Sequence, residues 1–114
     1  MRFSLVTLFV DDPFTVADWY REHLGLSEAH RTDRFVRLAD KSRKPCLALH
    51  VGAPVQRAEH VQLHFEVDDV DADHRRLAAE GVAVSSPPTD RPWGWRVAAF
   101  RDPAGHTVEL VQPL

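Results

Sequence analysis

The chain contains an internal repeat, which limits its possible folds more than any other feature of the sequence. Val10-Asp11-Asp12 and Val67-Asp68-Asp69 each follow an apolar segment and precede an amphipathic segment that stops at a glycine. The two valines are 57 residues apart (67 minus 10), and the two glycines, Gly25 and Gly81, are 56 residues apart (81 minus 25). A repeat of this length predicts two similar supersecondary units that face each other across a cleft.

Each copy of the repeat predicts a strand, then a helix, then three more strands. Asp12 can cap the first helix with Pro13 at its first position, and Gly25 can end it. The expected strands cover residues 5–10, 27–31, 35–38 and 45–51 in the first copy and 60–67, 82–84, 95–101 and 106–111 in the second, with a proline-rich loop over 85–92. The sequence therefore predicts one α+β domain of two βαβββ modules, at about 1–53 and 60–114, with a linker at about 54–59.

Composition restricts the functions that the chain can have. The 114 residues carry a net charge of −3, which gives no electrostatic basis for binding nucleic acid or an anionic membrane. The single cysteine, Cys46, cannot form an internal disulfide, which is typical of a protein in the reducing cytoplasm. The sequence shows no signal peptide and no membrane-spanning stretch. We therefore expect a cytoplasmic protein that binds neither nucleic acid nor membrane.

Several short motifs occur in a characteristic order along the chain. They are Val10-Asp11-Asp12, Tyr20 with Leu24-Gly25-Leu26, the segment 65–70, Trp93-Gly94, the segment 100–106 and Val108-Glu109-Leu110. In these motifs the chain resembles the vicinal oxygen chelate superfamily, which includes glyoxalase I, extradiol dioxygenases, fosfomycin-resistance enzymes and bleomycin-binding proteins. The resemblance covers nearly the whole chain and implies a paired-module fold and a homodimer, but the fold hosts both enzymes and binding proteins.

The resemblance also implies a position for a metal site. Family members that bind a metal take one ligand from the first and last strand of each module, and these positions fall near Leu5, Ala48, Gln62 and Glu109. Glu109 matches this pattern and Gln62 is an acceptable oxygen donor. Leu5 and Ala48 cannot coordinate a metal, so half of the usual ligand set is missing.

Histidines close to these positions leave two alternatives open. In one, Glu109 and His64 hold a divalent ion (Zn, Ni, Mn or Fe) together with Gln62 or His50. Glu109 is then the candidate catalytic carboxylate, which moves a proton while the ion acts as a Lewis acid. In the other, no metal is bound, and Glu109 forms a structural ion pair with Arg96 or Arg37.

Strand alternation selects further candidate ligand-binding residues. The odd positions of 61–67 are apolar, so Gln62 and His64 are expected to face the cleft, and Trp93 beside Gly94 offers an aromatic surface at its entrance. The full set of candidate ligand-binding residues is Phe9, Phe35, His50, Gln62, His64, Trp93 and Arg96. His23 and His106 are expected at the surface, and His30 gives no functional signal.

Two functions follow from these observations. The favoured one is a protein that binds a small organic molecule with its aromatic and polar cleft residues. The alternative is a divalent-metal-dependent enzyme, similar to glyoxalases or dioxygenases, that acts on a substrate with vicinal oxygens. The missing ligands at Leu5 and Ala48 favour binding, whereas Glu109, Gln62 and the neighbouring histidines favour the enzyme.

Overall fold

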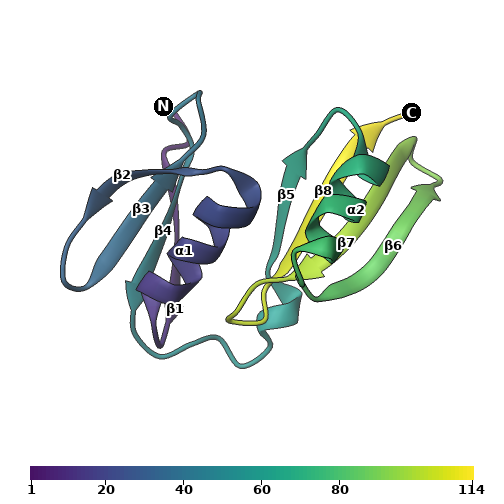
Figure 1. Cartoon of the computed structure of the whole chain (residues 1–114). Coiled ribbons are helices and arrows are strands. Elements are labelled where there is room, and N and C mark those ends of the chain that lie inside the picture. The colour runs from purple at the N-terminus through teal and green to yellow at the C-terminus, as the bar shows by residue number, and fades with distance from the viewer. The chain divides into compact units, whose positions relative to one another are not determined.

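Each half of the chain folds into a four-stranded sheet with one long helix on one face (Figure 1). The computed structural model describes all residues from 1 to 114, which separate into two units, Met1–Gln56 and Arg57–Leu114. The division after Gln56 falls inside the predicted linker. We refer to the two parts as the first and the second unit.

The first unit follows the predicted order of elements. Its elements are β1 (Leu5–Val10), α1 (Pro13–Leu24), β2 (Ser27–Arg31), β3 (Phe35–Ala39) and β4 (Cys46–Val51). The strands lie in the order β1-β4-β3-β2, with β1 parallel to β4 and the other neighbours antiparallel.

The second unit repeats this plan after a short 3-10 helix. Its elements are η1 (Ala58–His60), β5 (Gln62–Glu66), α2 (Val70–Ala79), β6 (Val84–Arg91), β7 (Trp95–Arg101) and β8 (Thr107–Pro113). The strand order is β5-β8-β7-β6, again with one parallel pair, β5 and β8. The equivalent order in the two units confirms the predicted pair of βαβββ modules.

The repeated aspartates begin the two helices. Asp12 Oδ1 accepts hydrogen bonds from the backbone N–H groups of Phe14 and Thr15, and its Oδ2 accepts one from the Thr15 hydroxyl at 2.7 Å. These bonds, the hydroxyl one above all, hold the pKa of Asp12 below its ordinary value. Asp69 caps α2 in the same way by accepting a bond from the N–H of Ala72 at 3.0 Å.

Strand residues on one side of each sheet form the core of that unit against its helix. In β1, Leu8 and Val10 are buried, whereas Phe9 between them is 46% exposed. Each sheet therefore has a side that packs against its helix and an opposite side, which we call the helix-free face. The most deeply buried residues are Val10, Ala17, Tyr20, Val36, Leu38 and Leu49 in the first unit and Val70, Leu77, Ala98, Phe100 and Val108 in the second.

Two predicted elements of the second unit differ from the structure. His60 belongs to η1 and not to the strand, which begins at Gln62. The segment predicted as a short strand and a proline-rich loop is instead one long strand, β6. Proline is tolerated there because β6 is the edge strand of its sheet, and the pairing with β7 is irregular between Ser86 and Thr89, where Pro87 and Pro88 lie.

The prediction of a surface position for His106 was wrong. His106 is only 1% exposed, and its Nδ1 lies 2.7 Å from Oδ2 of the buried Asp102. Asp102 Oδ1 also accepts hydrogen bonds from the N–H groups of Ala104 and His106, both at 2.9 Å. The pair thus fixes the turn between β7 and β8, and His106 has a structural role.

Candidate functional site

Aromatic side chains line up across the helix-free face of the first unit. Phe9 of β1 is directly opposite His50 of β4, which is directly opposite Phe35 of β3. Neighbouring rings are in contact: the Phe9 and His50 centroids are 5.3 Å apart, and the His50 and Phe35 centroids are 5.7 Å apart with planes only 10° from parallel. His30 of β2 continues the series, with its ring 5.7 Å from that of Phe35. We call Phe9, His50, Phe35 and His30 the aromatic row.

Local contacts hold two of these rings in place. His50 Nδ1 lies 2.7 Å from the carbonyl oxygen of Val51, so Nδ1 donates its hydrogen and Nε2 remains for another partner. A Cβ on Gly52 would lie 2.6 Å from Cδ1 of Phe9. The Phe9 ring therefore rests against the backbone at a position where only glycine leaves room for it.

The sequence did not identify His30 as a site residue, because its position depends on a β-bulge. The pairing of β2 with β3 shifts between Glu28 and His30, so that His30 lies opposite Arg37. A regular ladder continuing from the Glu28–Leu38 pair would place His30 opposite Val36, which is fully buried on the helix side. The extra residue turns His30 to the face of Phe35 and Arg37, and no periodic pattern in the sequence signals this change.

The helix-free face of the second unit carries ionisable groups instead of an aromatic row. The parallel register places His64 of β5 opposite Glu109 of β8, and His64 Nδ1 lies 3.2 Å from Glu109 Oε2. Both side chains are accessible, at 44% and 20% exposure. With Nδ1 directed at the carboxylate, His64 Nε2 is free to accept a hydrogen bond or to bind a ligand.

The internal repeat identifies the counterparts of this pair in the first unit. Thr7 lies 57 positions before His64, and Thr7 is opposite Ala48 just as His64 is opposite Glu109. Neither Thr7 nor Ala48 offers the imidazole or carboxylate of its counterpart. The pair of ionisable residues therefore occurs in only one of the two copies.

The donor set for a metal is incomplete within the second unit. His64 and Glu109 supply two ligands, and Gln62 is on the same face two residues along β5. No group of three or more His, Cys, Asp or Glu side chains is arranged to hold a metal ion anywhere in the chain. A protein site for a transition metal commonly has three or four such ligands, so the residues present do not by themselves fit a resident metal.

Arg96 lies on the other side of the sheet from these candidates. Its Nε and Nη2 donate to the two carboxylate oxygens of Asp71 at 2.9 Å, and its Nη1 donates to Asp90 at 2.9 Å. The two carboxylates raise the pKa of Arg96, and Arg96 lowers that of Asp71. The proposed pairing of Arg96 with Glu109 was therefore wrong, because the partner of Glu109 is His64.

Trp93 is located at the turn between β6 and β7. The N–H of Gly94 closes this turn on the carbonyl of Arg91 at 3.0 Å, with Gly94 at a φ of 89°. The Trp93 side chain is 66% exposed. It is thus presented at a hairpin tip of the second unit, and no ring contact links it to another aromatic residue.

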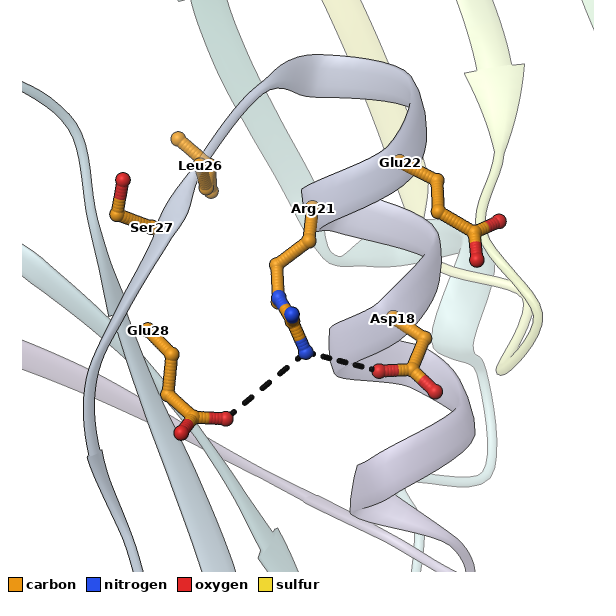
Figure 2. Close-up of a pocket in the computed structure, with 6 residues that line it drawn as sticks. All are labelled: Asp18, Arg21, Glu22, Leu26, Ser27 and Glu28. Atoms are coloured by element: carbon orange, nitrogen blue, oxygen red, sulfur yellow. Dashed lines mark hydrogen bonds and ion pairs between the residues drawn. The ribbon is translucent and has the colours of Figure 1, made fainter.

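A separate depression lies between α1 and β2, but its charges are already paired. Figure 2 shows Arg21 reaching between Asp18, at 3.2 Å, and Glu28, at 3.9 Å. Glu28 also accepts a hydrogen bond from Arg31 Nε at 2.8 Å. Such exposed pairs contribute little binding energy, so we do not place the functional site here. The lining residues are Asp18, Arg21, Glu22, Leu26, Ser27 and Glu28.

The duplicated βαβββ architecture defines a class of proteins that present ligand-binding or metal-binding groups on their sheets. The family model for the Glyoxalase/Bleomycin resistance protein/Dioxygenase superfamily matches residues 2–110. The chain therefore belongs to this superfamily, as its motifs predicted. Members of the superfamily bind small molecules, and many of them use a divalent metal.

Relatives of known structure include a binding protein and an enzyme. TnmS3, an antibiotic binding protein from Streptomyces sp. CB03234, is 33% identical, with a TM-score of 0.85 over 100% of this chain and 97% of its own. A lactoylglutathione lyase from Agrobacterium tumefaciens has a TM-score of 0.79 at 23% identity, over 97% of this chain and 92% of its own, which shows a shared fold alone.

A curated relative, the putative glyoxylase CFP32 of Mycobacterium tuberculosis, is 28% identical over 113 residues. That alignment covers 93% of this chain but 42% of the relative. The chain spans about two fifths of the length of the curated relatives that it matches. Neither α1 nor α2 has the length and apolar composition needed to cross a membrane.

Proposed function

We propose that the protein binds a small organic molecule through the aromatic row of its first unit. The observation that carries this proposal is the contact of Phe9, His50 and Phe35 across three adjacent strands on the helix-free face. The same three residues are ligand-binding candidates from the sequence. Gly52 also supports the proposal, because a side chain at this position would displace the Phe9 ring from the aromatic row.

The physical basis of binding is stacking and burial of a flat apolar surface. Phe9 is 46% exposed, and each aromatic contact with a ligand contributes about 0.5–1.5 kcal/mol in addition to the area removed from water. His50 Nε2 adds one directional polar group beside the rings. The likeness to TnmS3 supports the proposal further, because that protein is an antibiotic binding protein.

The test of this function measures binding of an uncharged planar probe, 2-naphthamide, by calorimetry and by the probe's fluorescence. We expect the double variant Phe9→Ala/Phe35→Ala to bind it roughly tenfold more weakly, because two ring contacts are lost. Phe3→Ala is the matched control, since Phe3 is a 66% exposed phenylalanine of the same unit outside the aromatic row. Equal affinity in the double variant and the control would contradict the proposal.

A second candidate function is a divalent-metal-dependent enzyme, and the contact between His64 and Glu109 favours it. In such an enzyme Glu109, His64 and Gln62 would be the ligands from the second unit. Because these residues do not form a complete ligand set, we derive no reaction from them. The pair also suits a metal-free role, in which Glu109 orients His64 so that Nε2 can exchange a proton with a bound molecule.

Metal content separates the two candidates. The protein would be purified without chelator, offered Zn, Ni, Mn and Fe(II) in turn, and measured by mass spectrometry and thermal unfolding. Stoichiometric metal that disappears in Glu109→Gln would support the enzyme and justify lyase and dioxygenase assays. Metal binding that Glu109→Gln leaves unchanged would exclude Glu109 as a ligand.

We also propose a cytoplasmic homodimer whose partner is a small molecule and not a nucleic acid. Its free Cys46 and its net charge of −3 support the location and the absence of a nucleic-acid partner. Sedimentation velocity of the purified chain tests the assembly, and a single species at the monomer mass of 12.9 kDa would contradict it.

A further inference from the structure

The helix-free face of the first unit carries one fixed charge, the guanidinium of Arg37. The strand residues on this face are Leu5, Thr7, Phe9, Ser27, His30, Phe35, Arg37, Ala39, Cys46, Ala48 and His50. No Asp, Glu or Lys is among them, although the chain as a whole has a net charge of −3. The face with the aromatic row is therefore positively charged within an acidic protein.

Arg37 lies directly beside the aromatic row. It is opposite His30 on β2 and opposite Ala48 on β4. On its own strand it follows Phe35 by two residues, so the two side chains emerge on the same face about 7 Å apart.

The guanidinium of Arg37 has no carboxylate partner, whereas Arg21 and Arg31 on the helix side of the sheet both have one. Arg31 and Arg21 both contact Glu28, which is opposite the buried Leu38 and therefore lies on the helix side. Arg31 also lies over the Phe14 ring of α1, at 5.1 Å from its centroid. The acidic residue of β2 is thus neutralised on one side of the sheet, while the half-buried Arg37 on the other side remains unpaired.

We infer that the ligand of the aromatic row is a planar aromatic anion, whose ring system contacts Phe9, His50 and Phe35 and whose carboxylate or similar oxygen group is bound by Arg37. This inference rests on the proposed function and adds the chemical class of the ligand. A guanidinium can donate two parallel hydrogen bonds to a carboxylate, and such charge-assisted bonds are about twice as strong as neutral ones. Arg37 is then the specificity-determining residue of the site.

The experiment compares two probes of nearly equal shape, 2-naphthoate and uncharged 2-naphthamide, at low salt. We expect wild-type protein to bind 2-naphthoate roughly tenfold more tightly, which is the effect of about one hydrogen bond to a charged group. Arg37→Gln should remove this preference, because it should weaken binding of 2-naphthoate far more than binding of 2-naphthamide. Arg34→Gln is the matched control, because Arg34 is exposed at the turn before β3 and should keep the preference.

The outcomes separate this inference from the proposed function. Equal binding of the two probes by wild-type protein, or an equal loss for both probes in Arg37→Gln, would overturn the inference while the aromatic row could still bind 2-naphthamide. Failure of both probes to bind would overturn both. Arg37→Lys keeps the charge but not the planar guanidinium, so it should retain part of the preference for 2-naphthoate. Thermal unfolding of each variant checks that it is folded.

Discussion

Gly52 shows how a single residue without a side chain can shape a binding surface. It follows β4 directly, and its N–H donates to the carbonyl of Val10 at 3.1 Å, which brings the two strand ends together. The Phe9 ring occupies the space that a Cβ would need. The position of one ring in the aromatic row therefore depends on a residue that contributes no group to a ligand.

Gly52→Ala should displace the Phe9 ring and weaken binding of 2-naphthamide by about the value of one ring contact, roughly three- to tenfold. The unfolding free energy should change by less than about 1 kcal/mol, since Phe9 is partly exposed and its ring can rotate away. Calorimetry on Gly52→Ala, Phe9→Ala and the double variant tests this coupling. If Gly52→Ala weakened binding equally in the Phe9→Ala background, the clash would not be the cause.

Much of the candidate site is predictable at the scale of single residues, because strand alternation is a local property. Phe9, Phe35 and His50 were selected from the sequence, and the structure brings them into contact. His30 was not selected, because its face depends on a bulge. The partners of Arg96 also were not predicted, because Asp71 is 25 residues away and pairs with Arg96 only once α2 is packed on the sheet.

Among the elements, the turn between β7 and β8 depends on a buried pair. Asp102 accepts three hydrogen bonds from within the turn, and one of these comes from the imidazole of His106. The turn brings β8 back beside β7, so that Glu109 is opposite Ala99 and next to β5. The position of the His64–Glu109 pair thus relies on a turn that contains neither residue.

His106→Ala should lower the unfolding free energy by about 3 kcal/mol, because it removes a donor from a buried carboxylate and leaves a cavity. His60→Ala is the matched control, since His60 is exposed in η1 and its replacement should cost less than about 0.5 kcal/mol. Urea unfolding followed by tryptophan fluorescence measures both. Equal stability of the two variants would show that the buried pair does not hold the turn.

Element types were predictable where the pattern was periodic and less so where proline was present. Both helices begin at the predicted residues because Asp12 and Asp69 act locally, and α1 ends just before Gly25 as predicted. The second helix, α2, ends at Ala79, two residues before the predicted Gly81. The strand β6 was predicted as a loop because Pro87 and Pro88 cannot donate to a ladder. Its true state depends on the sheet order, which makes β6 an edge strand, and sheet order is a tertiary property.

At the scale of the whole molecule, acid should destabilise both units. Hydrogen bonds to the carboxylates of Asp12 and Asp40 in the first unit and of Asp71 in the second hold the pKa of each group below its ordinary value. A group with a depressed pKa in the folded state stabilises the fold above its unfolded pKa. That contribution is lost as the pH falls through the folded pKa, since protonation then favours the unfolded chain.

The unfolding free energy should therefore be nearly constant above about pH 5 and should fall as the pH drops below about 4. Asp12→Asn/Asp71→Asn should reduce the steepness of this fall, because two of the titrating groups are gone. Urea unfolding between pH 7 and pH 2.5 provides the comparison. An unfolding free energy of the wild-type protein that rises towards low pH would contradict the lowered pKa values of these carboxyl groups.

The edge strands described above also bear on how the protein avoids aggregation. Exposed strand edges can recruit strands from other chains into continuous sheets. Pro87 and Pro88 interrupt the row of N–H donors along β6, and the bulge and charged residues of β2 disturb the corresponding edge of the first unit. These irregularities therefore make one of the two edges of each sheet a poor template for pairing with other chains.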